Sequence, residues 1–227
     1  MKKYLSLLAF AVAAIVPARA LPLLQLDVSG GVYDSSTQTT VSTSNNFTVY
    51  ALLNSLSPHS GNYFVSAALF PAPSSAGGNF GSFTVNGNTI NATSDMAYGT
   101  PTNLPVHGIY PTWYEEFAFS FVGATKFTNY NVQDVVGVHT GPVANSSGNA
   151  LYVPFVVDVS GLAPGTSLVF DLYTYGATGT GKVKFAPFSH NAGSGGGTSV
   201  PDGASTLLLG GIALIGLGAF QRRLASR

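Results

Sequence analysis

The sequence predicts an all-β domain, an antiparallel β-sandwich, and three observations lead to this expectation. Phe, Tyr, Val and Thr are frequent, whereas charged residues make up only 8% of the 227 residues. Gly, Pro, Asn and Ser recur at short intervals and divide the chain into short segments. No segment within residues 21–190 carries a helical stripe of useful length. Strands at this spacing favour a sandwich over a barrel.

The strand-like segments in the first half of the domain are residues 23–32, 46–53, 62–70 and 83–90. Asn86-Gly87 lies within the last of them and is a strong signal for a two-residue hairpin turn.

In the second half, strands are expected at residues 113–122, 126–132, 151–159, 167–175 and 182–188. Alternation is clear in residues 113–122, where the aromatic side chains of one face are Phe117, Phe119 and Phe121. It recurs in residues 167–175, where Leu168, Phe170 and Leu172 are expected on the face opposite Val169, Asp171 and Tyr173.

Both ends of the chain are expected to be targeting signals. Lys2 and Lys3 precede an apolar run over residues 5–16, and Ala18 and Ala20 form an A-x-A cleavage site, so residues 1–20 are predicted to be a signal peptide. The domain is then expected over residues 21–190. Residues 191–199, rich in Gly and Ser, are expected to be a flexible linker.

Residues 200–227 have three parts in a fixed order: Val200-Pro201-Asp202-Gly203, an apolar run over 206–220, and the basic residues Arg222, Arg223 and Arg227. The apolar run is shorter than the roughly 20 residues of a comfortable transmembrane helix. Arginines behind it favour a cytoplasmic end. We therefore expect a short transmembrane helix that holds the chain in the inner membrane only transiently.

This tripartite end resembles the PEP-CTERM sorting signals of Gram-negative bacteria, in the variant that reads VPDxxS/T. The resemblance implies that an exosortase recognises and processes the chain, which is then released to the cell surface or the extracellular matrix. An ordinary C-terminal membrane anchor is the alternative. Residues 24–34 running into 43–50, and residues 159–173, also resemble a choice-of-anchor (N-like) surface domain, a class of exported domains with interchangeable anchors, and this resemblance implies no activity.

The charge and the cysteine content limit the kinds of partner and chemistry that can be expected. Between residues 21 and 199, three lysines stand against eight acids, so this part of the chain carries a net charge of −5. A nucleic-acid partner is therefore not expected, because phosphate contacts need a basic patch. The chain has no cysteine, so neither disulfides nor thiolate chemistry contribute.

Residues that carry catalytic chemistry do not form a recognisable set. All four histidines (His59, His107, His139 and His190) are expected in surface loops, without zinc-ligand spacing. Glu115 and Glu116 are adjacent in a strand and should point to opposite faces, which prevents them from acting together on a sugar. Calcium binding through Asp27, Asp34, Asp158 or Asp171 stays open. No enzyme, cofactor or metal site is predicted.

Two functions are compatible with these observations. The first is a structural or adhesive role in the envelope, in exopolysaccharide or in biofilm. The second is a carbohydrate-binding module of the same matrix, with Trp113, Tyr110 and Tyr114 as sugar contacts. An exposed aromatic strip on one sheet would favour binding. Burial of Trp113, with its indole N–H hydrogen-bonded, would favour the structural role. A hydrolase is a third, weaker alternative.

Overall fold

The computed structural model describes residues 21–35, 37–58, 60–73, 78–102, 104, 108–175, 184–187 and 191–194. These residues form an all-β domain of two sheets, in which the single helical element is the 3-10 turn η1 (Val132–Asp134). The predicted signal peptide, sorting motif, transmembrane helix and basic tail lie outside the described residues. Within the described residues, no helix is long and apolar enough to cross a membrane.

The first sheet has the strand order β1-β4-β11-β6-β7, with β10 paired to β11. Its strands are β1 (Leu24–Val28), β4 (Asn46–Leu53), β6 (Ser82–Val85), β7 (Asn88–Asn91), β10 (Thr125–Phe127) and β11 (Ala150–Asp158). Strands β4 and β11 form its centre and pair along eight residues. All pairings in this sheet are antiparallel.

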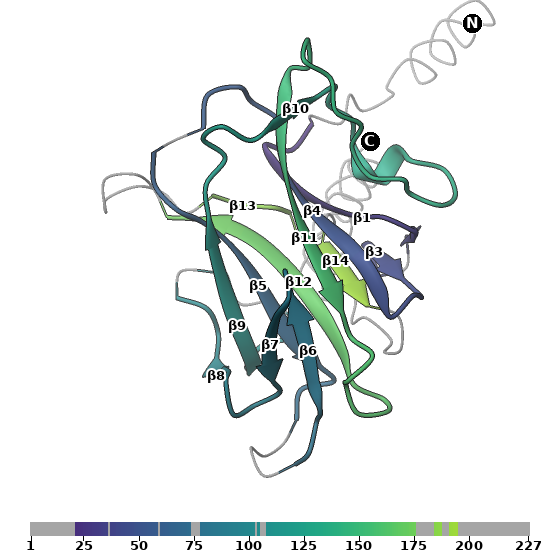
Figure 1. Cartoon of the computed structure of the whole chain (residues 1–227), viewed down its shortest axis with the longest axis vertical. Helices are drawn as coiled ribbons and strands as arrows, with labels where there is room; N and C mark the ends of the chain where they lie inside the picture. Colours follow the sequence, from purple (N-terminus) through teal and green to yellow (C-terminus); the bar gives the residue numbers. More distant parts are fainter. Residues whose placement is uncertain are drawn as a thin grey trace, which may run out of the picture.

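The second sheet has the order β2-β3-β14-β12-β5-β9-β8, with β13 also paired to β12. Its strands are β2 (Gly31–Asp34), β3 (Thr39–Ser42), β5 (Tyr63–Phe70), β8 (Ala97–Gly99), β9 (Thr112–Phe119), β12 (Ser167–Thr174), β13 (Lys184–Phe185) and β14 (Asn191–Ser194). Figure 1 shows β9, β5 and β12 side by side in this layer. The expected antiparallel arrangement fails at one pair, because β3 and β14 are parallel.

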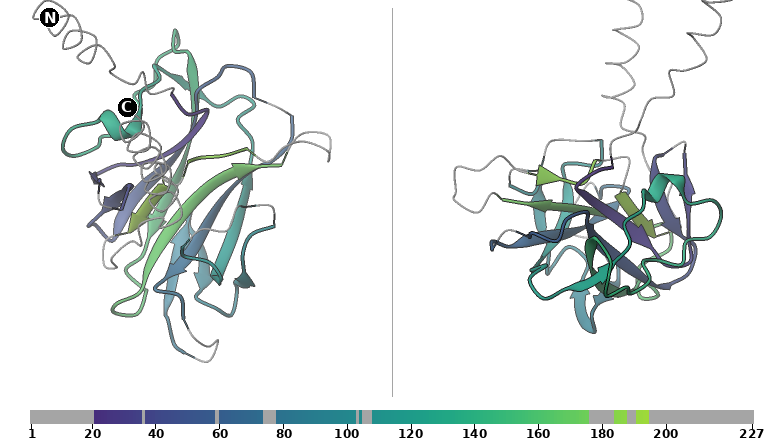
Figure 2. Two further views of the ribbon diagram at one scale, coloured as in Figure 1. Left: turned by 180° about the vertical axis from the view of Figure 1, so that it is seen from behind. Right: turned by 90° about the horizontal axis from the view of Figure 1, so that it is seen from above.

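The main hydrophobic core lies between the two sheets, which the views of Figure 2 show as separate layers. Alternate residues of β4, such as Phe47, Val49 and Ala51, point into it. In β12, Leu168 and its even-numbered neighbours enter the same core, while Val169 and Tyr173 pack in a second cluster on the outer face. This confirms the predicted alternation in residues 167–175. All eight residues of β12 are buried because both of its faces are covered.

The predicted hairpin at residues 83–90 is confirmed. β6 and β7 pair around Asn86 and Gly87, whose φ angles of 51° and 80° are those that a type I′ turn needs. The single strand predicted over residues 23–32 is two strands in the structure. β1 ends at Val28 and β2 begins at Gly31, with a turn at Gly30, where φ is 73°. Strands β3 and β8 were not predicted; they are four and three residues long.

The predicted linker is wrong for residues 191–194. These residues form β14, which is buried at every position and lies between β3 and β12. Asn191 Nδ2 donates to Asp171 Oδ1 at 2.8 Å, and the Leu168 amide donates to Ser194 Oγ at 2.8 Å. A Gly- and Ser-containing composition favours a flexible chain, but here the neighbouring strands supply hydrogen bonds on both sides. The domain therefore extends beyond residue 190.

Candidate functional site

The outer face of the second sheet carries a row of polar residues in register. Asp171 on β12, Ser66 on β5 and Glu116 on β9 are successive partners across the three strands. In the neighbouring row, Tyr173 stands beside Phe64. Because these residues come from segments far apart in the sequence, only the strand register brings them together.

Glu116 is the half-buried acid at the open side of this row. Its Oε1 accepts hydrogen bonds from the hydroxyls of Tyr173 and, at 3.3 Å, Tyr175. Burial, and then the Glu116 charge, raise the pKa of Tyr175 to about 12. The second carboxylate oxygen, Oε2, has no hydrogen-bond partner among the described residues. The carboxylate is thus held in one orientation with an acceptor left over.

Aromatic rings surround this carboxylate. Phe64 packs against Tyr175 with ring centroids 4.9 Å apart and stacks beside the buried Tyr173 at 5.8 Å. Phe64, Tyr114 and Tyr175 are half-buried. Ala118, which is the partner of Phe64 in the strand register, is exposed. We refer to Phe64, Tyr114, Glu116, Ala118 and Tyr175 as the aromatic face. It offers flat apolar surface next to a fixed hydrogen-bond acceptor.

The buried half of the row, Asp171 and Ser66, lies beside the aromatic face on the same side of the sheet. Asp171 is 1% exposed, and its Oδ2 accepts a 2.8 Å hydrogen bond from the Tyr110 hydroxyl. That hydroxyl lies 3.3 Å from Ser66 Oγ, and the Tyr110 ring contacts Tyr114 edge-on. Burial, then the Asp171 charge, raise the pKa of Tyr110 well above its ordinary value. Both oxygens of Asp171 are occupied, so its role is to hold Tyr110 and β14.

The three sugar contacts expected from the sequence do not form one surface. Trp113 and Tyr114 are consecutive strand residues and point to opposite faces of β9. Trp113 packs against the core between the sheets and contacts Tyr98 at 5.3 Å. Its indole nitrogen is buried and, contrary to expectation, has no hydrogen-bond partner among the described residues. Tyr110 is buried. Of the three, Tyr114 alone belongs to the aromatic face.

The adjacent acids behave as predicted, because Glu115 lies on the face of β9 opposite to Glu116. One histidine does not. His139 is 1% exposed, and its Nδ1 lies 2.5 Å from Asp27 Oδ1. The prediction of a surface loop was wrong for this residue because its partner is 112 residues away in sequence. His59, His107 and His190 lie outside the described residues.

Calcium ligands do not gather among the described residues, where no group of three or more His, Asp or Glu side chains could hold a metal ion. Asp27 and Asp171 are each engaged in separate hydrogen-bond networks. Asp158 instead accepts a hydrogen bond from the Ser160 amide.

Comparison with known proteins identifies no relative. No protein-family model matches the chain, and neither a curated protein nor a solved structure matches it significantly.

Proposed function

We propose that this chain is an exported, non-enzymatic β-sandwich protein of a bacterial cell surface or extracellular matrix, with a structural or adhesive role in exopolysaccharide. The observation that carries the proposal is the pair of terminal signals, above all the VPDG–apolar–arginine order of residues 200–227. β14 ends at Ser194, so five residues of sequence, 195–199, separate the described domain from Val200. Processing by an exosortase would release the domain.

Mass spectrometry of exported material from the native host tests this proposal. We expect an N-terminus at Leu21 and no peptide from residues 207–223. Pro201→Ala or Asp202→Ala should leave an unprocessed precursor in the inner membrane, whereas Thr198→Ala, just before the motif, should be processed normally. An intact C-terminus in surface material would contradict sorting and favour a plain anchor.

A second candidate function is carbohydrate binding by the aromatic face. Half-exposed rings of Phe64, Tyr114 and Tyr175 beside the Glu116 carboxylate are the chemistry that receives a sugar ring, which presents C–H groups on its flat face and hydroxyls at its edge. The aromatic face, as defined by its described residues, contains no Lys or Arg that could pair with an acidic sugar, so a neutral glycan is the class of ligand that it fits. This candidate replaces the expected platform at Trp113.

Affinity electrophoresis in gels containing the host's own exopolysaccharide tests this candidate. Phe64→Ala and Glu116→Gln should each abolish most of the retardation, because one removes stacking surface and the other weakens the fixed acceptor. Val156→Ala removes an exposed side chain (59% exposed) from another sheet and serves as the control. Equal retardation of all variants would remove the aromatic face from consideration while leaving the sorting proposal intact.

A further inference from the structure

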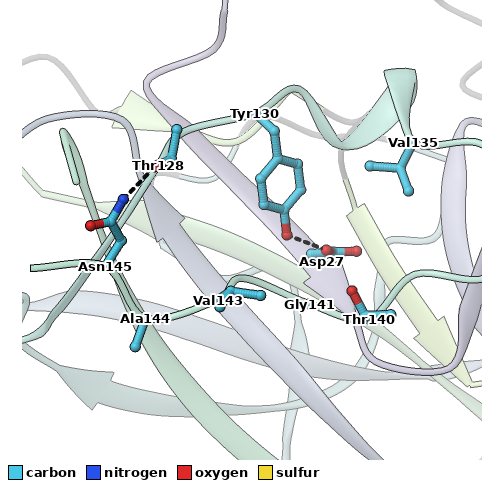
Figure 3. Close-up of a pocket in the computed structure, with 9 residues that line it drawn as sticks. All are labelled: Asp27, Thr128, Tyr130, Val135, Thr140, Gly141, Val143, Ala144 and Asn145. Carbon is cyan, nitrogen blue, oxygen red and sulfur yellow. Dashed lines mark hydrogen bonds between the residues drawn. The ribbon is translucent and has the colours of Figure 1, made fainter. Parts of the chain in front are cut away.

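A cavity of about 460 Å³ lies on the opposite side of the domain from the aromatic face. Its residues, drawn in Figure 3, are Asp27, Thr128, Tyr130, Val135, Thr140, Gly141, Val143, Ala144 and Asn145. Asp27 belongs to β1, whose neighbouring residues Leu26 and Val28 point into the core, so the cavity opens on the outer face of the first sheet. Its volume falls within the range of small-molecule sites, about 300–1,000 Å³.

The cavity is built on a buried carboxylate. Asp27 is 1% exposed; its Oδ1 accepts from the Val28 amide at 2.8 Å and lies 2.5 Å from His139 Nδ1. Its Oδ2 accepts from the Tyr130 hydroxyl at 2.5 Å, as Figure 3 shows. Because a carboxylate only accepts, His139 places its Nδ1 proton on this bond. His139 Nε2 is buried and has no partner among the described residues.

Residues 128–145, the segment that lines most of the cavity, are held to the first sheet at several points. Gln25, next to Asp27 on the same outer face, donates through Nε2 to the Tyr130 carbonyl and accepts through Oε1 from the Val132 amide. The main chain of His139 exchanges hydrogen bonds with Gly30 and Gly31. Since side-chain and main-chain bonds both fix this segment, the cavity exists before any ligand arrives.

The walls combine hydroxyl and amide groups with small apolar surfaces. Thr128, Thr140 and Asn145 supply polar atoms, and Figure 3 shows Asn145 donating to Thr128 on one side of the cavity with Thr140 near Asp27 on the other. Val135 and Val143 supply apolar contact. The described lining contains one carboxylate and no Lys or Arg, so it is unsuited to an anion. It can exchange hydrogen bonds in both directions with hydroxyls.

We propose that this cavity is a second binding site, which takes a neutral hydroxyl-rich ligand of about one sugar ring, such as the terminal unit of a glycan. The aromatic face is a flat surface that fits a chain lying along it, whereas the cavity is a recess that opens to solvent and fits the end of a chain. The two sites lie on opposite outer faces of the domain. A chain that uses both sites joins two glycan strands, and only this bridging consequence rests on the carbohydrate-binding candidate.

Titration of the full-length, isotope-labelled chain in a sugar-free detergent tests the site by amide NMR. The probes are methyl glucoside, methyl galactoside and methyl mannoside, with sodium glucuronate as the anionic comparison. At least one neutral glycoside should give saturable shifts at Tyr130, Thr140, Gly141 and Asn145, and glucuronate should give none. Val143→Trp fills the mouth from a side chain that is 77% exposed, and should weaken binding at least tenfold. Val156→Trp, from a valine that is 59% exposed outside the cavity, should change binding less than twofold.

Thr140→Val removes one hydroxyl at nearly constant volume and carries the test if Val143→Trp fails to fold. It should weaken binding several-fold. The absence of saturable shifts with all three glycosides, equal binding of glucuronate, or wild-type affinity in both cavity variants would each overturn the proposal. Glu116→Gln separates the two sites, because it should leave glycoside binding at the cavity unchanged even where polysaccharide retention is lost.

Discussion

The contribution of β14 to stability can be measured with two truncations and two substitutions. A chain that ends at residue 190 lacks β14, and a chain that ends at Ser194 retains it. Asn191→Ala removes a hydrogen bond to the Asp171 carboxylate, which costs about 2 kcal/mol for a charged acceptor. Ser194→Ala leaves the buried Leu168 amide without its acceptor and costs about 1 kcal/mol. The two bonds have separate partners, so the double variant should lose about 3 kcal/mol.

Urea unfolding of residues 21–194 and 21–190 provides the assay. Domain stabilities are about 5–15 kcal/mol, so the double variant should remain folded with a clearly lower midpoint. The shorter chain should lose at least as much, because β3 and β12 also become sheet edges. Single variants that leave the midpoint unchanged, or a 21–190 chain as stable as 21–194, would refute the assignment of β14 and restore the linker interpretation.

Three further predictions concern β9, two glycines and Trp113. Burial, then the charges of Glu116 and Asp95, raise the pKa of Glu115, so the ionised side chain destabilises the fold at pH values above that pKa. Glu115→Gln should therefore raise the urea midpoint at pH 7 but not at pH 3, and equal gains at both pH values would contradict this reasoning. Gly87→Ala should lower the free energy of unfolding by about 1 kcal/mol, through its positive φ alone. Gly81→Ala should lower it several times more, because the added Cβ would meet the Gly161 carbonyl oxygen at 2.0 Å. Thermal unfolding of the two variants measures the difference. Trp113 fluorescence should be partly quenched by acrylamide and unchanged by polysaccharide, because its ring packs inward; protection by polysaccharide would return Trp113 to the binding site.

Local patterns predicted the parts of the fold that depend on neighbours in sequence. The alternation in β12 and the Asn86-Gly87 turn are such features, because a two-residue period and a positive φ are properties of short segments. β14 could not be predicted in this way. Its four small residues carry no strand preference, and the strands that hold it lie elsewhere in the chain.

The candidate sites show the same division. Strand parity alone separates Trp113 from Tyr114, so the sequence already contained the argument against a shared platform. The burial of Tyr110 and His139 could not be predicted from their neighbours in sequence. The acids that they contact, Asp171 and Asp27, are 61 and 112 residues away. Buried polar pairs over such separations depend on the tertiary fold.

The location of β14 also determines how the domain transmits mechanical load. Tension applied to the residues after Ser194 enters through a strand inside the second sheet, with β3 on one side and β12 on the other. Force along the strand axis loads its hydrogen bonds in shear, so they must fail together rather than open one after another. A protein held by this end would therefore resist pulling better than one held by an edge strand, and single-molecule force spectroscopy would report this as a high rupture force.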